Sequence, residues 1–248
     1  MPDPFPNMRD ILKPGRCGAY AIEHFSLTED EALRANVIAA VGNPHYDEEE
    51  VEAGDYVRLV MPDELPANQV LMSDMGCERR TNLEVVERSK GQVIIGGLGI
   101  GMIIGPIYGK PEVERITVVE RSADVIALVV PSLRKYLNAT YPQYVGTDRL
   151  RVVKRDVHKY EPPKGAKADV IYMDIWNTPS CDAYLEMVAL KQRYNKWLAP
   201  SGWFECWRSA AAKADHEEYE SLEYRDAEPA WVTKLRRVGN ETKENNTT

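Results

Sequence analysis

The chain has 248 residues, a formal net charge of −8 and 44% hydrophobic residues, so it can form one large domain or a core with a small additional lobe. The acidic balance disfavours extended nucleic-acid binding, which needs a basic surface, and we expect neither a signal peptide nor a bilayer-spanning run of ~20 apolar residues. The four cysteines, Cys17, Cys77, Cys181 and Cys206, include no Cys-x-x-Cys pair, which predicts free thiols in a cytoplasmic protein and no zinc site.

Residues 1–90 are predicted to form a separate N-terminal lobe. Thr28 and Glu31 have the spacing of a capping box, which marks the start of a helix. The predicted elements are a helix from Thr28 to about Ala40, strands at 56–60 and 69–72, and a short helix at 83–89. The basic clusters Glu78-Arg79-Arg80 and Lys234-Leu-Arg-Arg237 are interpreted as solvated faces.

Residues 91–238 alternate between apolar strands and amphipathic helices. Such alternation predicts an α/β fold, a doubly wound and mostly parallel sheet with helices on both faces. The predicted strands are 92–96, 115–120, 150–155, 168–174, 203–207 and 229–238, and the predicted helices are 100–108, 123–137, 181–197 and 209–222. Residues 239–248 lack hydrophobic side chains and are predicted to be disordered.

A glycine-rich turn follows the first strand of this core. Residues 93–101 read Val-Ile-Ile-Gly-Gly-Leu-Gly-Ile-Gly, and Glu120 ends the next strand. Glycine lets the backbone approach a ligand closely, and a carboxylate at the end of the next strand can accept hydrogen bonds from both hydroxyl groups of a ribose. The pair therefore predicts an adenosine-containing cofactor, whereas the glycines alone also fit an ordinary tight turn.

The spacing of the glycines discriminates between cofactors. A dinucleotide fingerprint that starts at Gly97 would have its third glycine at position 102, where the chain has Met102. Instead, Gly97, Gly99 and Gly101 alternate along the turn. Nicotinamide-dependent reduction is therefore disfavoured.

Acidic residues also end two later strands, at Asp156 and Asp174. Each of them alone could be a helix cap or a solvated strand end. Ligands of open α/β sheets bind at the carboxyl ends of the strands. Together with Glu120, the two residues predict a binding site at that edge.

The core resembles the class I S-adenosylmethionine (SAM)-dependent methyltransferases, and within them the spermidine-synthase-like branch. The resemblance covers about residues 69–207 and rests on the alternating glycines, the three acid-ending strands and a hairpin near Met72-Ser-Asp74-Met-Gly76. It implies SAM as the cofactor and a homodimer through the N-terminal lobe. The cofactor-binding residues that it implies are Gly97, Gly99, Gly101, Glu120, Arg121, Asp156, Val157 and Asp174.

The resemblance also implies individual roles. Asp156 would accept a hydrogen bond from the adenine amino group, the backbone amide of Val157 would meet the adenine ring, and Asp174 would lie nearest the transferred group. Asp174 is the predicted base or orienting residue, with Asn177 forming hydrogen bonds nearby. Trp176 would form a wall over a cationic centre, or it is a core tryptophan.

Departures from the branch bear on the reaction. Aminopropyltransferases have an aspartate at the position of Gly99, close to the free amine of decarboxylated SAM. Gly99 removes that charge and is expected to open space, which favours intact SAM. The second aspartate after the fourth strand is Asn177 here, and Cys77–Asn82 lacks the acidic and tyrosine elements of the branch, so too few carboxylates are expected for a diamine site.

The leading hypothesis is therefore a SAM-dependent methyltransferase of the cytoplasm that acts on a small-molecule acceptor. One alternative is aminopropyl transfer, or cleavage or cyclisation of SAM with release of methylthioadenosine. A second is a SAM-fold binding protein without turnover. No metal-ligand spacing and no hydrolase motif is evident, and neither nucleic acid nor a membrane is an expected partner. His158, two residues after Asp156, is interpreted as a surface histidine, with a place at the border of the adenine pocket as the alternative.

Overall fold

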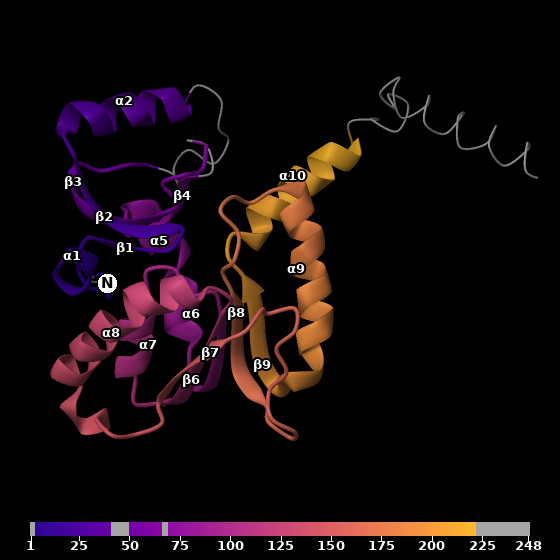
Figure 1. The fold of residues 1–248 in the computed structure, drawn as a ribbon. Coiled ribbons are helices and arrows are strands. Elements are labelled where there is room, and N and C mark those ends of the chain that lie inside the picture. The colour runs from indigo at the N-terminus through magenta and orange to yellow at the C-terminus, as the bar shows by residue number, and fades with distance from the viewer. Residues whose placement is uncertain (1–2, 41–49, 66–68, 222–248) are drawn as a thin grey trace, which may run out of the picture.

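A computed structural model describes residues 3–40, 50–65 and 69–221 of the chain (Figure 1). Its core is a five-stranded sheet in which all neighbouring strands are parallel. In the order β7-β6-β5-β8-β9, the strands are β7 (Leu150–Lys154), β6 (Val113–Glu120), β5 (Gly91–Gly96), β8 (Ala168–Met173) and β9 (Leu198–Cys206). The order reverses between β5 and β8, which is where open α/β sheets bind ligands. The predicted α/β fold is confirmed.

Helices cover both faces of this sheet, as Figure 1 shows. They are α7 (Ile104–Gly109) and α8 (Ala123–Thr140) on one face, α9 (Cys181–Tyr194) on the other, and α10 (Ser209–Ser221) after β9. Two short 3-10 helices, η1 (Pro142–Tyr144) and η2 (Asn195–Trp197), follow α8 and α9.

The strands alternate their side chains between the two faces. In β8, Val170 and Tyr172 join the hydrophobic cluster on the α8 side, whereas Ile171 and Met173 join the cluster on the α9 side. Burial on both faces explains why the strands read as continuous apolar runs.

The N-terminal lobe contains a second, antiparallel sheet in the order β1-β2-β3-β4. Its strands are β1 (Gly15–Cys17), β2 (Tyr20–Leu27), β3 (Gly54–Val60) and β4 (Val70–Ser73), and its helices are α1 (Met8–Ile11), α2 (Glu29–Ala40), α5 (Gly76–Thr81) and α6 (Leu83–Arg88). The capping box at the start of α2 is confirmed, because the backbone N–H of Glu31 donates to Oγ1 of Thr28 (3.3 Å) while the Thr28 N–H donates to the Glu31 carboxylate (2.8 Å).

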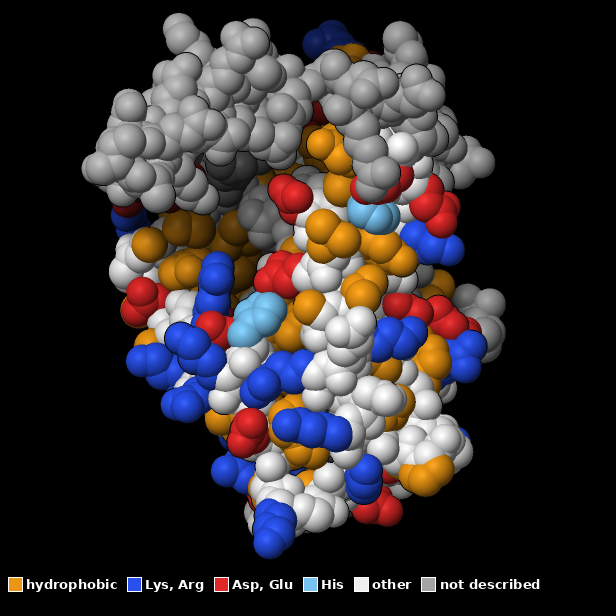
Figure 2. All heavy atoms as spheres, turned by 90° about the vertical axis from the view of Figure 1, so that its right-hand side faces the viewer, with side chains coloured by type: hydrophobic (Ala, Val, Ile, Leu, Met, Phe, Trp, Pro, Cys, Tyr) orange, Lys and Arg blue, Asp and Glu red, His pale blue; other side chains and the backbone are white. Residues whose placement is uncertain are grey.

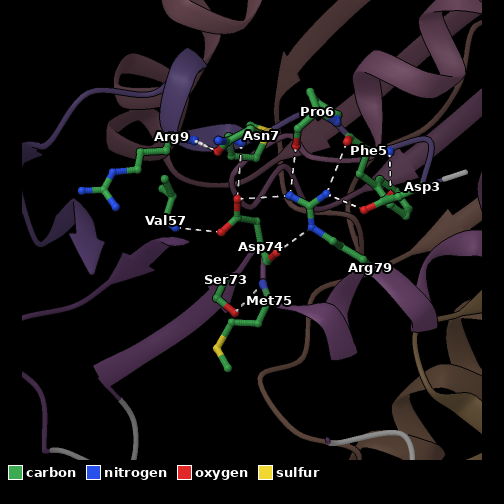
Figure 3. A network of polar contacts seen from close by, with 11 residues as sticks. Asp3, Phe5, Pro6, Asn7, Arg9, Val57, Ser73, Asp74, Met75 and Arg79 are labelled. Atoms are coloured by element: carbon green, nitrogen blue, oxygen red, sulfur yellow. Dashed lines mark hydrogen bonds and ion pairs between the residues drawn. The ribbon is translucent and has the colours of Figure 1, made fainter. Parts of the chain in front are cut away.

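A buried ion pair ties the lobe together (Figure 3). The carboxylate of Asp74, which is 1% exposed, accepts hydrogen bonds from the backbone N–H groups of Val57 (2.7 Å) and Met8 (3.3 Å). The guanidinium group of Arg79 lies 3.4 Å from the same carboxylate. Arg79 also donates to the carboxylate of Asp3 and to the backbone carbonyls of Phe5, Pro6 and Asp74. This Asp74–Arg79 network fixes the start of α5 against the first residues of the lobe.

Several predicted boundaries were wrong. The helix expected at 100–108 begins at Ile104, because Gly99 and Gly101 have positive φ angles of 50° and 75° that are incompatible with a right-handed helix. Strand β9 begins at Leu198, before the expected 203. Its pairing with β8 shifts register between Leu198 and Trp203, so Pro200 and Gly202 lie in a bulge.

Strands β1 and β2 and helix α5 were not predicted. The predicted strand at 229–238, the basic cluster at Lys234–Arg237 and the predicted disordered segment 239–248 lie outside the described residues.

None of the helices in the described part of the chain is long and apolar enough to cross a membrane. Figure 2 views the molecule from the right-hand side of Figure 1. Charged side chains of both signs are spread over the lower part of this face.

Candidate active site

A pocket of about 410 Å³ lies at the carboxyl edge of the parallel sheet. This volume falls in the range of about 300–1,000 Å³ that is typical of small-molecule sites. The ends of β5, β6, β7 and β8 contribute residues to it, and Tyr20, Met61, Leu71 and Met72 of the N-terminal lobe contribute others. All of the predicted site residues line this pocket except Gly101.

The glycine turn shapes the floor of the pocket. Gly97 has a φ of 91°, and a Cβ atom there would lie 2.0 Å from the backbone oxygen of Asp174. The Gly97 N–H donates to the carbonyl of Val119 on β6 (2.9 Å), and the Asp174 N–H donates to the carbonyl of Gly96 on β5 (2.8 Å). Only glycine therefore allows the turn to pass between the ends of β6 and β8.

Gly101 and Gly99 have other neighbours. Gly101 faces helix α8, where a Cβ atom would lie 3.0 Å from Cδ2 of Leu133, so the glycine serves helix packing there. Gly99 lines the pocket, but a Cβ atom would lie 2.1 Å from the sulfur of Met72. The expectation that Gly99 opens space is wrong, because the Met72 side chain of the lobe fills it.

Glu120 lies at the end of β6 with a side chain that is fixed by two loops. One carboxylate oxygen accepts a hydrogen bond from the N–H of Leu98 in the glycine turn (3.0 Å), and the other accepts from the N–H of Ser122 before α8 (2.7 Å). The residue is 8% exposed and lines the pocket. Its neighbour Arg121 is exposed and lines the pocket as well.

Asp156 and Val157 follow β7 in a tight turn. The Asp156 carboxylate accepts from the N–H of His158 (2.9 Å), and the Asp156 carbonyl accepts from the N–H of Lys159 (2.9 Å). Val157 is buried, and its backbone N–H donates to no group in the described part of the chain. The turn thus presents an unpaired amide donor beside a carboxylate.

Asp174 and Glu78 are carboxyl groups of a different kind in the same pocket. Burial raises the pKa of Asp174 to about 7. Burial, together with the negative charge of Asp174, raises the pKa of Glu78 to about 8, although the Arg208 guanidinium opposes this. The interpretation of Glu78 as part of a solvated face was wrong: it lines the pocket.

A further acid, Glu186 on α9, joins two aromatic groups at the pocket. One of its carboxylate oxygens lies 2.7 Å from Nε2 of His158, and the other accepts from the indole N–H of Trp176 (2.5 Å). Both interpretations of His158 hold in part, because the residue is exposed and also lines the pocket. Trp176 lines the pocket too, with Asn177 exposed beside it.

A cysteine and a histidine meet outside this pocket. The sulfur of Cys181 lies 3.2 Å from Nδ1 of His216. Burial and the negative charges of Asp182 and Asp215 raise the pKa of the Cys181 thiol, which disfavours a reactive thiolate. Among residues 3–40, 50–65 and 69–221, no cluster of histidine, cysteine or acidic residues could hold a metal ion.

No family model and no curated protein sequence matches the chain. Partial structural similarity exists to a putative methyltransferase from Thermoplasma acidophilum (18% identity, 48% of this chain and 44% of that chain, TM-score 0.32). It also exists to the CcbJ methyltransferase from Streptomyces caelestis (19% identity, 51% and 47%, TM-score 0.38) and to a methyltransferase from Podospora anserina with bound SAH (14% identity, 73% and 63%, TM-score 0.37). The chain thus spans less than half the length of the first two. We therefore base the function on the residues of the pocket.

Proposed function

We propose that the protein is an enzyme that binds SAM and transfers its methyl group to a small-molecule acceptor. The observation that carries this proposal is one pocket at the switch point of the sheet, shaped by Gly97 and bordered by Glu120, Asp156 and Asp174 at three strand ends.

The residues present fit the cofactor. Each oxygen of Glu120 accepts one backbone hydrogen bond, and since a carboxylate oxygen can accept two, each retains capacity for a ribose hydroxyl group. The unpaired N–H of Val157 and the carboxylate of Asp156 offer a donor and an acceptor side by side, which matches the edge of an adenine ring. Gly97 lets the turn pass between the ends of β6 and β8, which keeps its backbone in the lining of the pocket.

Asp174 is the residue that we assign to the acceptor. When bound, SAM supplies a methyl group on a positively charged sulfur, and displacement at that carbon requires mainly positioning and the exclusion of water. Because burial raises the pKa of Asp174 to about 7, its ionised form can take a proton from an acceptor near neutral pH. Asn177, beside Trp176 on the same loop, would orient the acceptor through its amide group.

Aminopropyl transfer is the second candidate, because Glu78 brings an additional carboxyl group to the pocket and a diamine site needs several. The antiparallel sheet of the N-terminal lobe supports membership in the spermidine-synthase-like branch. The two reactions differ in their products, since methyl transfer leaves S-adenosylhomocysteine and aminopropyl transfer leaves methylthioadenosine.

Calorimetric titration tests the cofactor. We expect SAM and S-adenosylhomocysteine to bind with dissociation constants in the range of about 1–100 μM, equivalent to roughly 5–8 kcal/mol, and NAD⁺ to give no heat of binding. Absence of binding by both SAM and its homocysteine product would refute the proposal. Mass spectrometry of the nucleoside released during incubation with SAM and an acceptor then separates the two reactions.

A further inference from the structure

We propose that Glu78 determines the acceptor specificity of this site, and that the acceptor is a cationic amine held between Glu78 and Asp174. The inference rests on the proposed function and extends it, because it names the chemical class of the acceptor.

The carboxyl groups of Glu78 and Asp174 lack hydrogen-bond donors within residues 3–40, 50–65 and 69–221. Both line the pocket, yet neither carboxyl group accepts a hydrogen bond from any group in the described residues. They are close enough for the charge of Asp174 to act on Glu78. Two neighbouring carboxyl groups without donors are complementary to a ligand that brings donors and positive charge, as an ammonium group does.

Two tryptophan side chains lie beside these carboxyl groups in the lining of the pocket. Trp176 and Trp207 both line the pocket, and the indole N–H of each is already bonded, to Glu186 (2.5 Å) and to Oγ1 of Thr81 (3.1 Å) respectively. Fixed indole rings attract a cation to their faces. Arg208 already lies over the Trp207 ring, 5.6 Å from its centroid, which leaves Trp176 as the indole ring that we assign to the acceptor.

Helix α5, which carries Glu78, is anchored by hydrogen bonds. Arg79 anchors the helix through the Asp74–Arg79 network (Figure 3). Thr81 accepts from Trp207, and Asn82 accepts from the hydroxyl group of Tyr172 on β8 (3.0 Å). Helix α5 and the residue that follows it are therefore bonded to both the lobe and the core. The backbone at Glu78 thus has little freedom to turn away from the pocket.

The titratable groups around Glu78 favour a cation over an anion. Asp174 approaches from the end of β8, and the phenol of Tyr172 and the thiol of Cys77 interact electrostatically with Glu78. Arg208, which follows β9, is the one cation that acts on Glu78 among the described residues, and it has interactions of its own. A cationic acceptor would stabilise the ionised forms of Glu78 and Asp174, whereas those forms would repel a carboxylate or phosphate acceptor.

The chemical step balances with these groups. The ammonium group of the acceptor gives one proton to the ionised Asp174 and becomes a neutral amine. The nitrogen lone pair then forms a bond to the methyl carbon while the carbon–sulfur bond breaks, and its electron pair stays on sulfur. A methylated ammonium ion, a neutral thioether and a protonated carboxyl group result, and Glu78 keeps the cationic product bound until release.

The experiment compares three matched ligands on the complex of the protein with S-adenosylhomocysteine: n-butylamine, n-butanol and n-butyrate. By titration calorimetry or ligand-observed NMR, we expect butylamine to bind at least about tenfold more tightly than butanol, which corresponds to about 1.4 kcal/mol. Butyrate should bind more weakly than both. Equal binding of amine and alcohol, or tighter binding of butyrate, would overturn the amine assignment even if S-adenosylhomocysteine binds normally.

Variants then locate the effect. Glu78→Gln should weaken butylamine binding by about tenfold and leave S-adenosylhomocysteine binding nearly unchanged, whereas Glu78→Asp should retain part of the preference for the amine. Glu84→Gln is the matched control, because Glu84 is exposed on the neighbouring helix α6 and pairs with Arg88. If Glu78→Gln binds butylamine as well as the wild type does, Glu78 is not the selecting residue. If no variant and no wild-type protein binds S-adenosylhomocysteine, it is the proposed function that fails.

Discussion

Carboxyl groups line both ends of the pocket, but they differ in whether the protein itself supplies their hydrogen-bond donors. At the cofactor end, the carboxylates of Glu120 and Asp156 accept hydrogen bonds from backbone N–H groups of their own loops. At the acceptor end, the carboxyl groups of Glu78 and Asp174 accept none from the described residues, and burial raises the pKa of each. The first pair is fixed before any ligand arrives, and the second pair depends on the ligand for its partners. We therefore expect the first pair to recognise the shape of a ligand, and the second pair to recognise its charge and to exchange a proton with it.

The largest effect should come from breaking the cofactor end at its glycine turn. Gly97→Ala would place a Cβ atom 2.0 Å from the backbone oxygen of Asp174 at a φ of 91°, so we expect a loss of about 3 kcal/mol or more in the free energy of unfolding. Urea denaturation measures this loss.

Gly146→Ala is the control for the backbone conformation. Gly146 has a φ of 81°, but nothing lies within 4 Å of its added Cβ atom, so only about 1–2 kcal/mol should be lost. Equal losses in both variants would mean that the contact with Asp174 is not what requires glycine at position 97.

A somewhat smaller effect should follow from removing the fixed carboxylate at the same end. Glu120→Ala leaves the N–H groups of Leu98 and Ser122 without their charged acceptor. The same carboxylate is the proposed acceptor for both ribose hydroxyl groups, and at about 1.5 kcal/mol for each of these two lost bonds the affinity for S-adenosylhomocysteine should fall about 100-fold. Calorimetry on Asn177→Ala, at an exposed position of the pocket, should show less than about a threefold change. The opposite order of the two variants would contradict the assignment of Glu120 to the cofactor.

The smallest effect should appear at the acceptor end, as a pH dependence of stability. The pKa of Glu78 is about 8 in the folded protein and 4.5 in its ordinary state. Between these values the folded state retains a proton that the unfolded state has released, so stability falls as the pH rises through this window and the loss is complete above pH 8.

Glu78→Gln removes the titrating group and therefore this loss. The full shift from 4.5 to about 8 would correspond to roughly 5 kcal/mol, but water at the half-buried side chain and the nearby Arg208 guanidinium reduce this figure. We therefore expect the melting temperature of the variant to exceed that of the wild type by about 2–4 °C at pH 9, which corresponds to about 1 kcal/mol, and by little at pH 4. Asp174, whose pKa is raised in the same direction, remains in both proteins, so the difference reports Glu78 together with its coupling to Asp174. A difference that is the same at both pH values would show that folding does not raise the pKa of Glu78.

The meeting of Gly97 and the strand-end acids at one pocket could be predicted from the sequence, because it follows from local rules. A buried strand followed by Gly97, and later strands that end in Glu120, Asp156 and Asp174, place these residues at one edge as soon as the sheet is parallel. The function of Gly101 differs from the expectation, since its contact with Leu133 depends on how α8 packs. Spacing alone does not distinguish a glycine that faces a ligand from one that faces a helix.

The acceptor end could not be predicted in the same way. Glu78 lies in a segment that reads as charged and solvated, and Glu186 lies on α9 among other polar residues. They reach the pocket only through tertiary contacts, such as those of Thr81 with Trp207 and of Glu186 with Trp176. Strands β1 and β2 escaped prediction because β1 has no buried residue and the two buried residues of β2, Ala21 and Ile22, are adjacent, so neither strand shows the alternation by which strands are recognised.

The anchoring of α5 has a consequence for how such a protein can diversify. This helix belongs to the segment that joins the lobe to the sheet, and none of the residues that shape the glycine turn lies on it. Substitutions in residues 76–82 can therefore change which molecule is recognised and leave the adenosine half of the pocket intact. On the proposed assignments, an exchange of residues 76–82 alone, which keeps Met72 against Gly99, should change the acceptor and preserve the affinity for the nucleoside.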